Sequence, residues 1–453
     1  MVRSTSMTVE DLLNYPKFGS GIGFRRLSEL LHPMLNTPWG AEFETIKITG
    51  SNGKGSVTAL VHGILRGLGV NCGRHTSPHL VRFHERIVVG DAEITDPQLK
   101  QAFEWLGSRI EQVAREIPGD QFGSFELITA LCLRAFYDAE LTSGVMEVGI
   151  GGRYDPLRLL PGRLVALTSV DLEHTDLLGK TKELIAYEKA DICPDGGTIV
   201  AIRRDHDLWD RITAYCHIRN IDLINANDNW IVELISDASD QSLSYMKVNL
   251  TSGQLRTQVS VPLVGTFQLD NISVACTVAE IWARQHLPQL STDQWVEGLI
   301  RGLTTTKWPG RFEQISVIPP VIIDVGHSPD ACERLIQSIA KFLPRHKLLL
   351  VTGVSYDKAV GDILQILVQP AQEIICTRAY HKGESVQRIS GLVRQLAPSK
   401  EVWEANTIEE AVSLAKQIAT SQAMTILVAG GLFLAIEFRT AWHGGDPREL
   451  RFY

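Results

Sequence analysis

The sequence has 453 residues, of which 44% are hydrophobic and 21% are charged, and this length accommodates two domains with apolar cores. Its formal net charge of −8 excludes a general nucleic-acid-binding protein, since such proteins present a basic face. The seven cysteines are scattered without a CxxC pair, which excludes a zinc or disulfide framework. We find no export signal and no membrane-spanning stretch, and therefore expect a cytoplasmic protein.

The first predicted elements surround a glycine-rich loop. A helix over residues 23–34 precedes a β-branched strand over 45–49, and an apolar-periodic helix begins at Val57. Glycines let backbone N–H groups approach phosphate oxygens, a lysine adds positive charge, and a hydroxyl reaches Mg²⁺. Gly55 separates the lysine from the hydroxyl here, unlike in the common phosphate loop. A glycine turn without a ligand would not account for the lysine and the hydroxyl in this context. We therefore assign phosphate binding to Gly50, Ser51, Asn52, Gly53, Lys54, Gly55 and Ser56.

Apolar strands and helices alternate in the segments that follow. We expect strands over 70–74, 144–148, 165–170 and 199–202, and helices over 96–116 and 125–139. This alternation predicts a mostly parallel, doubly wound sheet covered on both faces. Residues 220–265 differ, because their short alternating segments predict a small antiparallel excursion before a helix over 270–285. The polar segment 304–311, with its Pro and Gly, is the predicted linker.

A second, smaller alternation follows the linker. We expect strands over 321–325, 348–354, 374–377 and 426–429, and helices over 330–342, 358–368, 384–396 and 407–420. This arrangement predicts a Rossmann-like α/β domain. The sequence thus predicts an α/β protein with a phosphate-loop domain over residues 1–305 and a C-terminal domain over 306–453.

Polar residues that follow two of the predicted strands are candidate ligands. In a doubly wound sheet ligands bind at the carboxyl ends of the strands. Ser77 could bind Mg²⁺ and Arg82 could pair with an anion there, although a solvated loop explains both equally well. Glu147 ends a buried strand, where a carboxylate is costly unless it is paired or metal-bound. An ion pair with Arg153 is the structural alternative for Glu147.

Further candidates lie beyond residue 170. His174 could bind a second metal, although a lone histidine is more often structural. Lys189 occupies a partly buried helix position, and a pair with Glu188 would account for it without a function. Arg311 follows the Pro-Gly turn of the linker, where an arginine could clamp a phosphate. Ordinary turn capping is as good an account as ribose or phosphate binding for Asp324 and His327.

Together these segments resemble the folylpolyglutamate synthase/dihydrofolate synthase family of Mur-type ligases. The matching motifs run in order over nearly the whole chain: GSNGKGS (50–56), SPHLVRF (77–83), EVGIGGR (147–153), EHTD (173–176), EKA (188–190), VGTFQLDN (264–271), WPGRFE (308–313), DVGHSP (324–329) and DK (357–358). The short segment before the phosphate loop also fits this family.

The resemblance implies a role for each matching position. Lys54 and Ser56 would bind ATP phosphates and Mg²⁺, and Asn271 the adenine side. The second domain would contribute the phosphate and ribose contacts of Arg311, Asp324 and His327. The implied metal ligands are Ser56, Ser77, Glu147, His174 and Lys189, the last as a carbamate. The implied catalytic residues are Lys54, His174, Lys189 and Arg311, and the implied substrate contacts are Arg82, Phe125 and Asp155.

The resemblance also implies the reaction. A folate-type or other carboxylate acceptor would attack the γ-phosphate of ATP, and L-glutamate would then displace phosphate from the acyl phosphate. Lys54 and Mg²⁺ would neutralise the charge on the transferred group. Two Mg²⁺ sites, a monovalent cation and a monomeric state are implied, without a nucleic-acid or membrane partner.

Four departures from the family pattern leave the acceptor open. Asp155 begins the segment DPLR where relatives commonly have DATN, and Phe267, Ser328 and Asp171 replace other residues. The alternatives are therefore a related ligase with a non-folate acceptor, or a nucleotide-binding protein that has lost ligase activity. The displaced hydroxyl of the phosphate loop and the second domain disfavour a kinase or GTPase.

Overall fold

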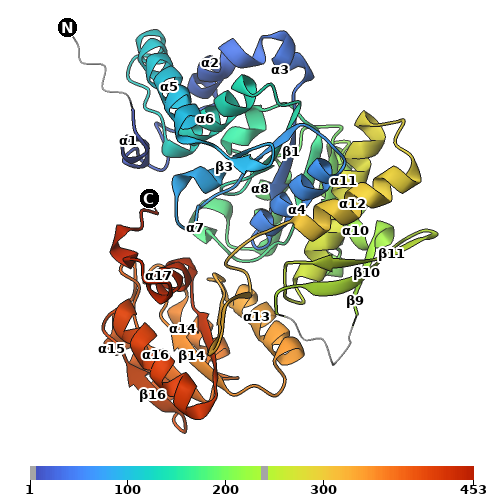
Figure 1. Ribbon diagram of the computed structural model, residues 1–453. Coiled ribbons are helices and arrows are strands. Elements are labelled where there is room, and N and C mark those ends of the chain that lie inside the picture. Colours follow the sequence, from blue (N-terminus) through green and yellow to red (C-terminus); the bar gives the residue numbers. More distant parts are fainter. Residues whose placement is uncertain (1–6, 236–242, 453) are drawn as a thin grey trace.

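The computed structural model describes residues 7–235 and 243–452, which form three β-sheets and their covering helices (Figure 1). The largest sheet has the strand order β4-β3-β2-β5-β1-β6-β7-β8. The strands from β2 to β8 pair in parallel, and β3 and β4 add an antiparallel edge. The bounds are β1 Glu44–Thr49, β2 Cys72–His75, β3 Ile87–Val89, β4 Ala92–Glu93, β5 Ser143–Glu147, β6 Leu164–Leu167, β7 Thr198–Ala201 and β8 Asp222–Asn225.

Helices cover both faces of this sheet because its buried strands are apolar on both sides. In β6, Leu164 and Ala166 pack against one set of helices, and Val165 and Leu167 against the other. The first set contains α4 (Lys54–Gly67), α11 (Gln268–His286) and α12 (Thr292–Thr305). The second set contains α2 (Phe24–Leu35), α5 (Asp96–Glu116), α6 (Ser124–Asp138), α8 (Lys182–Ala190) and α9 (His206–Ile218).

The C-terminal sheet has six strands in the order β12-β13-β17-β14-β15-β16 (orange to red in Figure 1). All its neighbouring strands pair in parallel except β12 and β13. Its strands are β12 Glu313–Val317, β13 Pro320–Ile323, β14 Leu348–Thr352, β15 Glu373–Cys376, β16 Glu401–Glu404 and β17 Thr425–Ala429. Its helices are α13 Pro329–Phe342, α14 Val360–Leu367, α15 Val386–Leu396, α16 Ile408–Gln422 and α17 Leu432–Trp442. The predicted fold class is confirmed: two doubly wound α/β sheets with a small antiparallel sheet beside them.

The small sheet corrects one boundary. Its antiparallel strands are β9 (Ile231–Leu234), β10 (Met246–Ser252) and β11 (Leu255–Val261). The predicted excursion was therefore too long, because β8 at its beginning joins the large sheet in parallel with β7. Short strands at a sheet edge carry too little periodicity to be assigned to one sheet or another from sequence.

Helix α12 was not predicted, and its last residues were wrongly assigned to the linker. Ser291 caps its N-terminus in a capping box with Gln294, a signal that is present in the sequence. The helix packs closely on α4, because any side chain at Gly67 would collide with the backbone of Gly298. This contact fixes α4, whose other end carries the phosphate loop.

Among the described residues, no helix combines the length and apolar character that a membrane span needs.

The remaining short elements connect these layers. They are α1 Val9–Leu13, α3 Pro38–Glu42, α7 Thr175–Leu178 and α10 Ala226–Asn229, with 3-10 turns η1 Phe83–Arg86, η2 Pro156–Leu159 and η3 Pro447–Glu449. Helix α7 is important for the site, because its N-cap residue is the candidate ligand His174.

Candidate active site

The glycine-rich loop lies between the end of β1 and the start of α4. Gly50 and Gly53 have φ values of 143° and 87°, a region that favours glycine. Helix α4 begins at Lys54, so its unpaired N–H groups point into the loop. The Lys54 ammonium donates to the carbonyls of Gly50 at 2.8 Å and Ser51 at 3.1 Å. The loop therefore concentrates backbone donors and a positive charge, which is the arrangement that binds phosphate.

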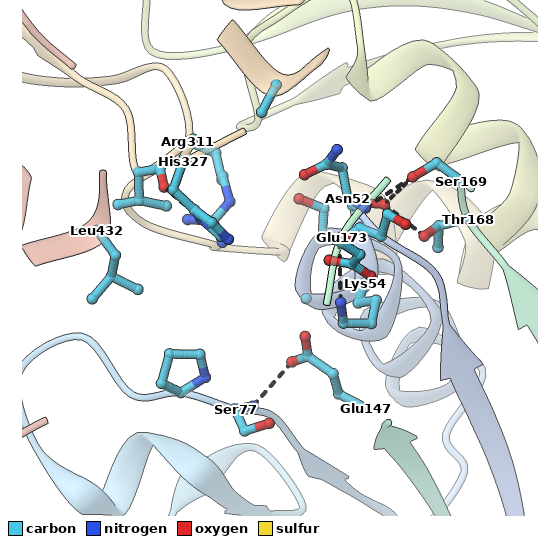
Figure 2. A pocket seen from close by; sticks show the side chains of 18 of the residues that line it. Asn52, Lys54, Ser77, Glu147, Thr168, Ser169, Glu173, Arg311, His327 and Leu432 are labelled. Atoms are coloured by element: carbon cyan, nitrogen blue, oxygen red, sulfur yellow. Dashed lines mark hydrogen bonds between the residues drawn. The ribbon is translucent and has the colours of Figure 1, made fainter. Parts of the chain in front are cut away.

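The end of β6 braces this loop (Figure 2). The Ser169 hydroxyl accepts from the Asn52 backbone N–H at 2.8 Å, and the Thr168 hydroxyl donates to the Asn52 carbonyl at 2.6 Å. The Ser51 N–H donates to the Ser169 carbonyl at 2.9 Å. The loop is thus fixed by its neighbouring strand before any ligand binds, which lowers the entropic cost of binding.

A cavity of about 320 Å³ opens beside the loop. Most of the sequence-predicted residues line it, and Figure 2 shows how ten of the lining side chains are placed around it. The structure brings to this wall Ser51, Asn52, Gly53, Lys54, Gly55, Ser56, Ser77, Phe125, Glu147, His174, Asn271, Arg311, Asp324 and His327. Both large sheets therefore contribute to a single cavity.

Glu147 is a buried carboxylate at the end of β5. Its side chain is only 5% exposed, and the Ser77 N–H donates to it at 3.0 Å. Burial raises the pKa of Glu147, while the charge of Lys54 opposes that shift. The alternative of a pair with Arg153 is wrong, because Arg153 pairs with Glu188 at 2.9 Å and Asp191 at 2.5 Å. Glu147 thus presents oxygen to the cavity, and no cationic side chain among the described residues is bonded to it.

Glu173 and Lys189 form an ion pair at the cavity wall. The Lys189 Nζ lies 2.7 Å from a Glu173 carboxylate oxygen, so the predicted alternative partner Glu188 is wrong. Burial lowers the pKa of Lys189 to about 8, against the attraction of Glu173. Burial also opposes ionisation of Glu173, but the charges of Lys54 and Lys189 bring its pKa down to about 2. The pair therefore combines a firmly ionised acid with a lysine that loses its proton easily.

His174 lies next to this pair and lines the same cavity. Its φ of 46° is unusual for a residue other than glycine, and the residue is the N-cap of α7. Burial, together with the charges of Lys358, Lys17 and Lys54, lowers the pKa of His174 despite Glu173. A neutral imidazole is the form that binds a metal ion.

The C-terminal sheet supplies Arg311, Asp324 and His327. Asp324 accepts from the N–H groups of Phe312 at 2.9 Å and Gly326 at 2.7 Å, so turn capping accounts for its carboxylate. Burial raises the pKa of Asp324, against the charge of Arg311. Burial lowers the pKa of His327 to about 4. Arg311 and His327 lie on the opposite side of the cavity from Glu147 in Figure 2.

Four predicted residues do not line the cavity, namely Gly50, Arg82, Asp155 and Lys189. Arg82 is exposed and pairs with Glu93 at 2.6 Å. Asp155 is buried and accepts from the N–H groups of Gly149 at 3.0 Å and Leu157 at 2.9 Å, while burial raises its pKa to about 6. Asp155 therefore caps η2 beneath the Gly149 loop. Lys189 reaches the cavity through its contact with Glu173.

Sequence reasoning missed several cavity residues. Glu173 precedes His174 directly, and this adjacency was an available signal. Lys17, Arg204, Lys382 and Phe433 come from separate segments, and only the folded chain brings them together.

Two family models match the chain. The model described as the Mur ligase middle domain matches residues 107–279, and the model described as the glutamate ligase domain of Mur ligases matches residues 310–432. The two matches together cover well over half of the chain.

Curated relatives match over most of its length. A folylpolyglutamate synthase of Lacticaseibacillus casei is 27% identical over 97% of this chain and 98% of its own. A probable bifunctional folylpolyglutamate synthase/dihydropteroate synthase of Halobacterium salinarum is 30% identical over 95% of this chain. The chain spans about half the length of that bifunctional protein, namely 51%.

Solved structures agree with the fold. A folylpolyglutamate synthase of Thermotoga maritima superposes with a TM-score of 0.77 at 25% identity, covering 94% of this chain and 95% of its own. A Mycobacterium tuberculosis folylpolyglutamate synthase complexed with ADP superposes with a TM-score of 0.82 at 24% identity, covering 95% and 96% of the two chains. At that identity the second likeness supports the fold alone.

Proposed function

The chain belongs to the Mur ligase family, in its folylpolyglutamate synthase/dihydrofolate synthase group, and on this premise we propose that it joins L-glutamate to a folate-type carboxylate with ATP. The observation that carries this proposal is the convergence of the phosphate loop, Glu147 and Arg311 on one cavity. The names of the relatives do not favour the alternatives of a non-folate acceptor or of lost activity.

The reaction begins at the phosphate loop. An oxygen of the acceptor carboxylate attacks the γ-phosphorus of ATP, the bond to ADP breaks, and an acyl phosphate forms. Lys54 and the N–H groups at the start of α4 stabilise the charge that gathers on the transferred phosphoryl group. Arg311 approaches from the C-terminal sheet and supplies further positive charge.

The amide bond forms in a second step. The neutral amine of L-glutamate attacks the carbonyl carbon of the acyl phosphate, inorganic phosphate leaves, and the amine loses a proton. The acyl phosphate is needed because a free carboxylate is a poor electrophile. We propose that residues 1–305 and 306–453 act as two domains whose closure excludes water, which would otherwise hydrolyse the acyl phosphate.

The cavity residues fit Mg²⁺. Ser56, Ser77 and Glu147 provide hydroxyl and carboxylate oxygens, the ligands that this ion prefers. Within residues 7–235 and 243–452 no cluster of three His, Cys, Asp or Glu side chains could hold a metal alone. This suits an ion that is held by one or two protein ligands and by nucleotide phosphates. When bound, Mg²⁺ would neutralise phosphate charge during transfer.

A carbamate on Lys189 is part of the proposal. Carbamylation needs a neutral amine, and burial brings the pKa of Lys189 to about 8. The new carboxylate would lie beside Glu173 and His174, where it could support a second Mg²⁺. A monovalent cation and a monomeric state remain predictions.

Product formation with defined acceptors tests the proposed function. ADP release and amide product are measured with ATP, Mg²⁺ and L-glutamate, using dihydropteroate, tetrahydrofolate and unrelated aromatic carboxylates as acceptors. We expect turnover with at least one of the two pterin acceptors. Turnover with another carboxylate, and with neither pterin, would contradict the folate-type assignment. The absence of amide product with every acceptor would contradict ligase activity.

A further inference from the structure

The segment that connects α12 to β12, residues 306–312, follows α4 toward the phosphate loop. Helix α12 itself lies beside α4 in Figure 1. A side chain at Gly63 would collide with the side chain of Thr306, and a side chain at Gly55 would collide with the indole of Trp308. Because Gly55 lies in the first turn of α4, the connecting segment reaches the end of the helix that carries the phosphate loop.

Trp308 contacts a second residue of the large sheet. The guanidinium carbon of Arg74, in β2, lies 5.3 Å from the ring centre of Trp308, which is cation–π geometry. Trp308 also packs against the apolar core around α4. Neither Arg74 nor Trp308 belongs to the cavity lining, so any role of this stacked pair in the site is exerted through other residues.

Arg74 has no acidic partner. Among the residues that the structure describes, it forms no ion pair, and its buried Nε has no hydrogen-bond partner. Burial lowers the pKa of Arg74 to about 10, against the charges of three glutamates, of which Glu93 has the largest effect. A buried cation is costly without a close partner, and a guanidinium is the cation that stacks best on an aromatic ring. The ring of Trp308 is therefore the contact that stabilises Arg74.

The turn after Trp308 carries Arg311 into the cavity. Gly310 has a φ of 77°, its N–H donates to Glu313 at 2.7 Å, and its carbonyl accepts from the Val325 N–H at 3.0 Å. These contacts attach the turn to the C-terminal sheet, whereas Trp308 attaches it to α4. Arg311 thus follows a turn that is anchored on both sides, and Figure 2 shows its side chain at the cavity.

The Arg311 side chain has little support of its own. Within the described part of the chain, its guanidinium forms no ion pair and donates one hydrogen bond, to the Gly310 carbonyl at 3.3 Å. The direction of this side chain therefore depends on the backbone that carries it, and so on the contacts that hold Trp308.

We propose that Arg74 and Trp308 are positioning residues for Arg311. The stacked pair holds the connecting segment against the start of α4, and in this way it brings the Arg311 guanidinium to the phosphates of the nucleotide. This inference rests on the proposed function, which assigns those phosphates to the cavity. It also accounts for the glycine between Lys54 and Ser56, because a side chain at Gly55 would displace the indole.

Binding of a non-hydrolysable ATP analogue tests the positioning role without turnover. Arg74→Met removes the charge and keeps an unbranched side chain, and we expect the Kd of the analogue, measured by calorimetry with Mg²⁺, to rise about tenfold. Trp308→Leu, which removes the ring, should raise the Kd by a similar factor. Trp308→Phe keeps an aromatic face and Arg74→Lys keeps the charge, so each should stay within about threefold. A Kd within about twofold for a folded Arg74→Met variant would overturn the inference.

Combination with Arg311→Met distinguishes positioning from a general structural role. Arg311→Met alone should raise the Kd about tenfold or more, because it removes the phosphate contact. If Arg74 acts through Arg311, adding Arg74→Met should raise the Kd by less than about twofold further. A further tenfold rise would overturn the inference, since Arg74 would then act independently. The same combination with Trp308→Leu provides this test if Arg74→Met does not fold.

The matched control is Arg134→Met. Arg134 in α6 lies 5.4 Å from the ring centre of Trp105 in α5, and neither residue lines the cavity. The Kd of the analogue should stay within about twofold in this variant. An equal rise in the control would contradict the inference, because loss of any arginine–tryptophan contact would then be sufficient.

The binding measurements separate this inference from the proposed function. Coupled losses of nucleotide affinity, without amide product from any acceptor, would support the positioning role and contradict the ligase function. Amide formation by Arg74→Met with an unaltered kcat and an unaltered KM for ATP would leave the ligase function intact and contradict the positioning role.

Discussion

Two buried lysines beside the large sheet have similar pKa values but different partners. Lys47 in β1 and Lys189 in α8 are each 1% exposed, and burial lowers the pKa of both to about 8. Lys47 donates to the carbonyls of Leu160 at 2.8 Å and Gly162 at 3.2 Å. Lys189 instead pairs with Glu173, which lines the cavity.

The difference lies in the partner and in the access from the cavity. The backbone carbonyls around Lys47 hold its ammonium inside the sheet, and the lysine does not line the cavity. Lys189 does not line the cavity itself, but it contacts Glu173, an ionised acid that does. Both lysines thus have a lowered pKa, but of the two it is Lys189 that contacts a charged residue of the cavity wall, and this is why we propose a function for Lys189.

Replacement of Lys189 should produce the largest effect. We expect Lys189→Ala to reduce ligation by about 10²-fold or more, because the proposed carbamate cannot form. ATP binding should remain measurable, since the phosphate loop does not contact Lys189. Amide product is measured by chromatography, and ATP binding by calorimetry.

The matched control for this prediction is Lys47→Met. It removes an equally buried lysine from the same domain, and its ligation rate should stay within about threefold of the unaltered protein, as for a substitution outside the site. Full activity of Lys189→Ala would show that this lysine is merely structural. Equal loss in both variants would show that burial, and not the link to the cavity, is what matters.

The comparison of Lys47 with Lys189 also predicts a smaller effect, on the free energy of unfolding. The pKa of Lys47 is about 8 in the folded chain and 10.5 when exposed, so between these values the unfolded chain binds more protons. Stability contributed by this group therefore rises from pH 8 to pH 10.5, by at most about 3 kcal/mol. Urea unfolding of Lys47→Met at several pH values should lack this rise. An identical pH dependence in both proteins would contradict the assigned environment of Lys47.

Local signals in the sequence predicted much of the fold. The spacing of apolar residues gave α5 its observed bounds, and the glycine pattern located the loop between β1 and α4. Helix α12 was missed although its capping box was readable, and β8 was assigned to the wrong sheet. The pairing of short edge strands depends on distant partners, which periodicity does not record.

The site could be predicted only in part for the same reason. Residues at strand ends, such as Glu147, were found because a parallel sheet aligns those ends. Arg82 and Asp155 are near the site in sequence, but Glu93 and the Gly149 loop hold their side chains elsewhere. Lys17 and Lys382 line the same cavity from two loops that no local pattern connects. Side-chain direction within a loop is set by contacts made after folding.

The comparison of partly buried charges also applies to two neighbouring carboxyl groups. Asp171 from the large domain and Asp330 from α13 both accept from the Asn52 amide, at 3.3 Å and 3.2 Å. Lys182 lies 3.2 Å from Asp171, and Arg334 lies 2.7 Å from Asp330. Burial and then the charge of Asp330 raise the pKa of Asp171, whereas Arg334 overcomes burial and lowers that of Asp330.

Because the pKa of Asp171 is raised in this contact, its carboxyl group binds a proton more tightly here than it would in water. Its contribution is therefore full on the acid side and is lost as the pH rises through the raised pKa. We expect the KM for ATP to increase about threefold or less over that range, since Asn52 belongs to the phosphate loop and the groups are partly solvated. Asp171→Asn keeps a neutral hydrogen-bonding group at this position, so its KM should vary less as the pH rises from 3.8 through the raised pKa of Asp171. Steady-state kinetics over that range measures the difference, and parallel pH profiles for the two proteins would show that the carboxyl pair does not couple the domains to nucleotide binding.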